Sequence, residues 1–151
     1  LVAAANALGW VSASQLRDFA VEIERGKTTA ENRRIYPWGD DANSKKMNFS
    51  QTGIGSTSAV GAFPLGVSLF GCEDMSGNVW EWTMTSMTVD YKHYDRIADN
   101  RPDASEFSRV LRGGSFDSTE SGARCAFRFN YDPNLDFNFI GFRVVASPIY
   151  L

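Results

Sequence analysis

Histidine and cysteine are scarce in this sequence, and their scarcity argues against several kinds of catalytic or metal site. The only histidine, His93, lies in the polar stretch VDYKHYDR. A surface position is its simplest interpretation, so a serine–histidine or cysteine–histidine pair has little support. The two cysteines, Cys72 and Cys125, have a spacing that fits no zinc motif. Whether they pair stays open, because sequence alone does not show proximity, and the redox compartment stays open with it.

Long apolar runs and basic clusters are also missing. No stretch approaches the ~20 apolar residues that a helix needs to cross a bilayer, so we predict no membrane span. The net charge is −3 and no block of Lys and Arg stands out, so we predict no nucleic-acid partner. The start, LVAAANALGW, has no basic leader, and we predict no signal peptide. Since it also has no initiator Met, we expect a processed product or a part of a longer chain.

The chain of 151 residues has the size of one domain, so we predict a single domain over residues 1–151. Residues 1–35 are predicted to be a helical N-terminal part, because SASQLRDFAVEIERG has apolar residues at helical spacing and Gly26 in the place of a C-cap. After Gly26 the sequence is dense in Gly, Pro, Ser and Asn, which indicates long ordered loops. RVLRGGSF is typical of a buried strand that enters a Gly-Gly turn, and IGFRVVAS of a closing strand. We therefore predict an α+β fold, rich in loops, with short antiparallel strands.

The segment RFNYDPNLDFNF has an unusual mixture of Phe, Tyr, Asn and Asp. Phe127, Phe129 and Tyr131 alternate with polar residues, which is the period of a strand, until Pro133 interrupts the pattern. One interpretation is a hairpin whose aromatic face is buried in the core. The other is an exposed recognition patch, in which aromatic rings give contact area and Asn or Asp give adaptable hydrogen bonds. Composition alone does not separate the two.

The segment EDMSGNVWEW places two carboxylates, Asp74 and Glu81, on either side of a turn that contains Gly77. Calcium prefers several oxygen ligands that mix carboxylates with backbone carbonyls. The simpler interpretation is that Asp74 caps a turn and Glu81 pairs with an arginine, and the spacing, which is not that of an EF-hand, favours it.

Five motifs taken together resemble the formylglycine-generating-enzyme (sulfatase-modifying factor) family. They follow the family's order from about Tyr36 to Val145, and they are YPWGD, VGAFPLGVSLFGCEDMSGNVWEWT, RVLRGGSF, ARCAFR and IGFRVV. The resemblance implies a C-type-lectin-like fold. The enzymes of this family use a cysteine pair just after the RGGSW motif, but here Ser118 stands at the first of those positions and Cys125 matches a non-catalytic position. The resemblance thus predicts a protein that is not an enzyme.

One branch of the family, the variable proteins of diversity-generating retroelements, is more similar. In those proteins a reverse transcriptase mutates template adenines, so that Asn codons become codons for Phe, Tyr, Asp or Leu. The resemblance implies a variable region within residues 109–145. It assigns these ligand-binding positions: Asp117, Ser118, Thr119, Phe127, Phe129, Asn130, Tyr131, Asp132, Leu135, Phe137, Asn138 and Phe139.

The resemblance also implies a structural calcium ion, held by the carboxylates of Asp74 and Glu81 and the carbonyls of Gly77 and Val79. Our hypothesis is a non-catalytic receptor or adhesion-type protein that binds a protein or cell-surface ligand, on a phage particle, at a cell surface or in the cytosol. The alternatives are a sulfatase-modifying-type enzyme or accessory domain with unidentified chemistry, and a structural module with a buried aromatic hairpin. The scaffold residues expected in the core are Trp80, Trp82, Val110, Leu111, Ile140 and Phe142.

Overall fold

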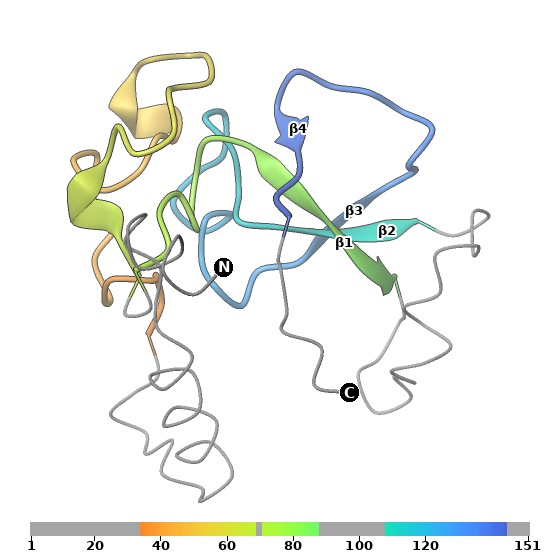
Figure 1. The fold of residues 1–151 in the computed structure, drawn as a ribbon, viewed down its shortest axis with the longest axis horizontal. Helices are drawn as coiled ribbons and strands as arrows, with labels where there is room; N and C mark the ends of the chain where they lie inside the picture. The colour runs from red at the N-terminus through yellow and green to blue at the C-terminus, as the bar shows by residue number, and fades with distance from the viewer. Residues whose placement is uncertain (1–33, 69–70, 88–107, 145–151) are drawn as a thin grey trace, which may run out of the picture.

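The computed structural model describes residues 34–68, 71–87 and 108–144 of the chain (Figure 1). Nearly all of the helical part predicted for residues 1–35 lies outside these residues. The same holds for most of the polar insert, including His93, and for Val145.

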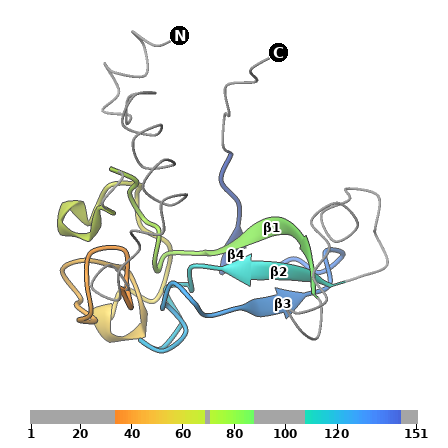
Figure 2. The ribbon, with the colours of Figure 1, turned by 90° about the horizontal axis from the view of Figure 1, so that it is seen from below.

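Four short strands form one sheet in the order β3-β2-β1-β4 (Figures 1 and 2). They are β1 (Trp80–Ser86), β2 (Arg109–Arg112), β3 (Phe129–Tyr131) and β4 (Ile140–Gly141). β2 is antiparallel to both β1 and β3, and its register pairs Leu111 with Trp82 on one side and with Phe129 on the other. β2 therefore links the tryptophan-containing strand to the aromatic segment.

The prediction of antiparallel strands is wrong for β4, which runs parallel to β1. After β3, residues 132–139 carry the chain from one edge of the sheet to the other (Figure 1). Such a crossing returns the chain to the end of the sheet where β3 began, so the next strand runs in the direction of β1. Strand direction here depends on the path of a loop, which the sequence pattern does not show.

The predicted buried strand and Gly-Gly turn are both present. In β2, Val110 is 2% exposed and Leu111 is fully buried. Gly113 and Gly114 follow with φ values of 92° and 77°, a conformation that favours glycine. A Cβ atom on Gly114 would lie 2.9 Å from the Cα of Ala123, so this turn also packs directly on the backbone of the next segment.

The described residues before β1 consist mainly of loops, with two 3-10 helices, η2 (Ser50–Thr52) and η3 (Pro64–Gly66). Its hydrophobic core holds Tyr36, Met47, Phe49 and Ala123. The Tyr36 hydroxyl donates a hydrogen bond to the carbonyl of Glu120 at 2.9 Å, so the core joins the start of the described chain to the segment after β2. This loop-rich arrangement agrees with the sequence prediction.

The predicted core residues divide into three groups. Trp80, Val110 and Leu111 are buried, as expected, whereas Trp82 and Ile140 are half-buried. The prediction for Phe142 is wrong, because its side chain is 75% exposed. β4 has two residues and lies at the edge of the sheet, so Phe142 comes after its end and has no second strand to pack against among the described residues.

Candidate functional site

An aromatic cluster runs from β1 through β3 into the loop before β4. Strand alternation places Phe129 and Tyr131 on one face of β3, with their ring centroids 5.3 Å apart. Trp80 of β1 stacks on Phe129 at 5.2 Å and also contacts Phe127 at 5.8 Å. Two further rings continue the cluster, because Phe137 lies 4.9 Å from Tyr131 and stacks on Phe139 at 5.0 Å.

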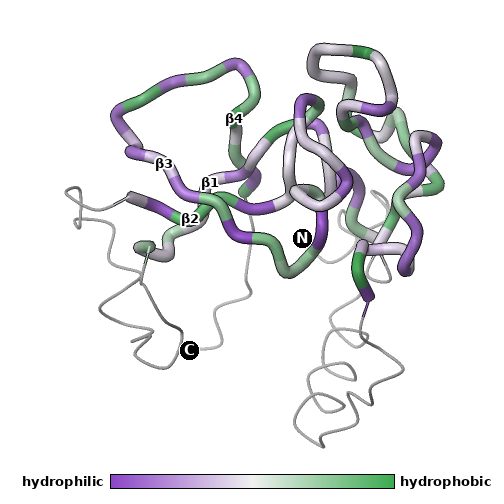
Figure 3. The backbone as a smooth tube through the Cα atoms, turned by 180° about the vertical axis from the view of Figure 1, so that it is seen from behind, coloured by the Kyte–Doolittle hydropathy of each residue, from purple (hydrophilic) through white to green (hydrophobic). Residues whose placement is uncertain are grey.

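The cluster is neither a closed core nor a set of isolated surface rings. Phe129 and Phe137 are 37% and 38% exposed, and Leu135 in the loop before β4 is 48% exposed. Tyr131 and Phe139 are half-buried. Hydrophobic and hydrophilic residues alternate along the loop between β3 and β4 (Figure 3). A fully buried aromatic hairpin, as the structural-module alternative requires, does not match this arrangement.

The cluster opens into a pocket of about 190 Å³. The turn after β2 supplies the polar wall of this pocket. Two separate segments that contain predicted ligand-binding residues therefore meet here. Asp117, Ser118, Phe129, Tyr131 and Phe139 were predicted as ligand-binding residues and do line the pocket. The other residues that line it are Trp80 and Ser115.

The remaining predicted ligand-binding residues lie outside this lining. Most of them are exposed on the loops around it, whereas Phe127 is half-buried under Trp80. They are Thr119, Phe127, Asn130, Asp132, Leu135, Phe137 and Asn138.

The polar wall is a tight turn that its own hydroxyl groups stabilise. The backbone N–H of Ser115 donates to the Ser118 hydroxyl at 2.9 Å, and the N–H of Ser118 donates to the Ser115 carbonyl at 3.0 Å. The N–H of Ser50 donates to the Ser118 carbonyl at 3.0 Å and ties the turn to the core. Asp117 at the tip of the turn is exposed.

Hydrogen bonds from β1 and β2 hold the aromatic segment at both ends. Arg112 of β2 donates through Nη1 to the carbonyl of Phe127 at 3.1 Å and to that of Cys125 at 3.3 Å. The N–H of Trp80 donates to the carbonyl of Phe139 at 2.8 Å. The side chains between these anchors can therefore change without removing the hydrogen bonds that place their backbone.

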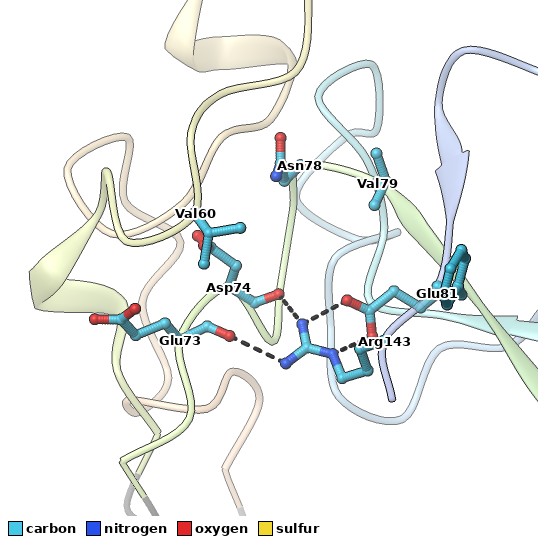
Figure 4. Close-up of a pocket in the computed structure, with 8 residues that line it drawn as sticks. Val60, Glu73, Asp74, Asn78, Val79, Glu81 and Arg143 are labelled. Carbon is cyan, nitrogen blue, oxygen red and sulfur yellow. Dashed lines mark hydrogen bonds and ion pairs between the residues drawn. The ribbon is translucent and has the colours of Figure 1, made fainter. Parts of the chain in front are cut away.

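Three of the four predicted calcium ligands, Asp74, Val79 and Glu81, line a second pocket of about 200 Å³ together with Arg143 (Figure 4). Both carboxylate oxygens of Glu81 accept hydrogen bonds from Arg143, which also donates to the carbonyls of Asp74 at 2.7 Å and Glu73 at 3.1 Å. Hydrogen bonding to Glu81 raises the pKa of Arg143 above its ordinary value. The arginine partner for Glu81, one of the two interpretations of this segment, is thus present.

A calcium ion at Glu81 would have to share that carboxylate with Arg143. Each oxygen of Glu81 already accepts a hydrogen bond from the guanidinium. The Asp74 carboxylate accepts a hydrogen bond from the N–H of Gly61 at 2.9 Å. Val79 lines the pocket, and Gly77 lies in the turn before it. The calcium site stays a prediction, in which a calcium ion would compete with Arg143 for Glu81.

Sequence reasoning missed three residues of these sites. Trp80 was expected in the core and is buried, but one part of it lines the aromatic pocket. Ser115 looked like part of a strand end, and Arg143 looked like part of a closing strand. For Trp80 the sequence did contain one signal. Neighbouring residues in a strand point to opposite faces of the sheet, so Trp80 and Glu81 in GNVWEW line different pockets.

Comparison with known protein families matches residues 10–148 to the sulfatase-modifying factor enzyme 1-like domain. The chain belongs to this family. Hercynine oxygenase of Mycolicibacterium thermoresistibile is 35% identical over 107 residues, which cover 66% of this chain and 24% of that protein. The formylglycine-generating enzyme of Bos taurus is 29% identical over 130 residues, which cover 76% of this chain and 34% of that enzyme. The chain therefore spans about a quarter to a third of these relatives.

A solved structure, Treponema denticola variable protein 1, has a similar fold. It superposes with a TM-score of 0.58 at 20% sequence identity, over 71% of this chain and 39% of that chain. The described residues contain no helix that is long and apolar enough to cross a membrane.

Proposed function

We propose that this chain is a non-catalytic ligand-binding protein with a C-type-lectin-like fold, whose surface at residues 117–119 and 127–139 is diversified by a retroelement. The observation that carries the proposal is the pocket in which Asp117 and Ser118 meet Phe129, Tyr131 and Phe139. These two segments are more than ten positions apart in sequence, yet they share one opening. The similarity to a variable protein at the level of fold supports the same interpretation.

The division between scaffold and surface favours this function. The N–H of Trp80 and the guanidinium of Arg112 bind backbone carbonyls of the aromatic segment, so they do not depend on its side chains. Meanwhile Asn130, Asp132 and Asn138 are exposed and polar. Partly exposed rings can bury contact area at a small cost in rotamer entropy, and the polar neighbours supply selectivity.

The absence of the family's cysteine chemistry is part of the proposal, and the residue at position 118 supports it. Ser118 occupies the position that the resemblance gives to a catalytic cysteine. Desolvation of the sulfur raises the pKa of the Cys125 thiol, which lowers the fraction of reactive thiolate at neutral pH. The family includes enzymes, so assay of a cysteine-containing sulfatase peptide tests the alternative, and formation of formylglycine would contradict our proposal.

Selection of a random peptide library on the immobilised protein tests the proposed surface. We expect enriched peptides to lose binding to a variant with Phe129→Ser and Phe137→Ser. A matched control carries Val60→Ser and Leu65→Ser, since these side chains are 80% and 63% exposed on another part of the molecule. Equal binding to both variants, or loss with the control alone, would contradict the proposal.

A further inference from the structure

The aromatic pocket has a chemical character that narrows its ligand. Its lining residues include four aromatic residues, Trp80, Phe129, Tyr131 and Phe139, and one acidic residue, Asp117. Within the described part of the chain, no Lys or Arg is among the lining residues. A pocket with aromatic walls and a negative charge at its rim favours an organic cation, because ring quadrupoles and the carboxylate both attract positive charge.

The polar groups of the pocket differ in whether they already have hydrogen-bond partners within the protein. The Ser115 and Ser118 hydroxyls lie 3.1 Å apart and bond to each other and to the turn backbone. The Asp117 carboxylate makes no hydrogen bond or ion pair in the part of the chain that the structure describes, and its side chain is exposed. Asp117 is therefore the pocket's available charged acceptor, and a ligand that brings hydrogen-bond donors and positive charge would complement it.

The volume of the pocket suits one chemical group of a larger ligand, such as a single side chain. Sites for whole small molecules usually have about 300–1,000 Å³, whereas this pocket has about 190 Å³. A side chain from a larger partner would fill it, and the exposed Asn130 and Asp132 could contact the rest of that partner. Among protein side chains, arginine combines a planar cation that stacks on rings with a fork of donors that fits a carboxylate.

Other occupants fit less well. An anion would face the Asp117 charge, and the surrounding loops add three more exposed acidic residues, Glu120, Asp132 and Asp136. A metal ion would find one carboxylate and two hydroxyls that already bond to each other. A purely apolar side chain would leave the carboxylate without a partner at the rim.

We propose that this pocket binds an arginine side chain of a protein ligand, with the guanidinium between the aromatic rings and the Asp117 carboxylate. The proposal rests on the proposed function, since it names the ligand chemistry of the same surface. Lysine shares the charge but not the planar fork, so it should bind more weakly.

Nuclear magnetic resonance titration with two short peptides tests this proposal. One is acetyl-Gly-Arg-Gly-amide, and the other replaces Arg with citrulline, which has nearly the same shape and no charge. We expect the arginine peptide to shift the Trp80 indole signal with a dissociation constant in the millimolar range, and the citrulline peptide to bind at least about fivefold more weakly. Equal binding of the two peptides, or no binding of either, would overturn the proposal.

Two matched variants locate the effect. Asp117→Asn should weaken binding of the arginine peptide by about five- to tenfold, whereas Asp40→Asn, which removes the same charge from an exposed position outside the pocket and the proposed surface, should leave it unchanged. Tyr131→Leu should weaken binding by about two- to fivefold, because it keeps an apolar wall and removes a ring quadrupole. Equal losses with Asp117→Asn and Asp40→Asn would show general charge attraction and overturn the proposal.

The library selection separates failure of this inference from failure of the proposed function. Enriched peptides that depend on Phe129 and Phe137 but keep their affinity when arginine is replaced by citrulline would overturn the arginine pocket alone. Such peptides would leave the diversified binding surface in place.

Discussion

Gly77, which the resemblance assigns to the calcium site, has a packing role of its own. Its φ is 83°, and a Cβ atom at this position would lie 2.4 Å from the Asn48 carbonyl oxygen. The N–H of the next residue, Asn78, donates to that same carbonyl at 2.8 Å. Close approach of two backbone segments thus explains the glycine without any ion.

The first prediction compares Gly77→Ala with Gly53→Ala. Gly53 has a similar φ, 75°, but no atom lies within 4 Å of the position that a Cβ would take there, so its substitution measures backbone strain alone. We expect Gly53→Ala to lower the free energy of unfolding by about 1–2 kcal/mol. Gly77→Ala should lower it by about 1–3 kcal/mol more, because overpacking adds to the strain. Urea denaturation measures both, and equal effects would contradict the packing role of Gly77.

The second prediction concerns the reactivity of Cys125. Desolvation raises the pKa of the Cys125 thiol above the ordinary thiol pKa of 9.0. Most of the thiolate should therefore form only at a pH above 9.0. In a Cys72→Ser variant, the rate of alkylation by iodoacetamide should therefore keep rising beyond about pH 9. A midpoint below about pH 8 would indicate an activated thiol and would favour the enzyme alternative.

Among the structural elements, β2 and the turn after it were the easiest to predict. RVLR is an apolar-centred run before two glycines, and burial and turn geometry are both local consequences of that pattern. The direction of β4 and the exposure of Phe142 were not predictable in this way. Both depend on how residues 132–139 cross the sheet, and that path is set by contacts such as the hydrogen bond from the Trp80 N–H to the Phe139 carbonyl.

The third prediction tests the calcium site by changing Arg143, which follows β4. Arg143 donates to both oxygens of Glu81, so a calcium ion and the guanidinium should compete for this carboxylate. We expect Arg143→Gln to bind calcium more tightly than the wild type, measured by calorimetric titration after treatment with a chelator. A variant that binds no calcium would contradict the calcium prediction.

The same variants separate competition from loss of folding. Arg143→Gln removes hydrogen bonds to the Glu73 and Asp74 carbonyls and should lower the melting temperature, so its circular dichroism must be checked first. Glu81→Gln provides the matched control, because it removes the carboxylate that either cation needs. We expect no calcium-dependent change in that control.

At the scale of the whole molecule, the candidate site was predictable in its residues but not in its shape. The alternating pattern and the family resemblance identified Asp117, Phe129 and Tyr131 separately. Their meeting in one pocket depends on the order of the strands, which places β3 beside β2 and brings Trp80 against Phe129. Tertiary contacts of this kind have no local signature, so Trp80 was assigned to the core alone.

The DNA around the coding sequence tests the central claim of a diversified binding surface most directly. We predict a nearby, nearly identical repeat together with a reverse transcriptase gene. The repeat should differ from the coding copy only at template adenines, at codons within residues 117–119 and 127–139, and should match it at the codons of Arg109–Arg112 and Ile140–Gly141. Absence of such a repeat, or differences spread over other bases and over the strand codons, would contradict the account.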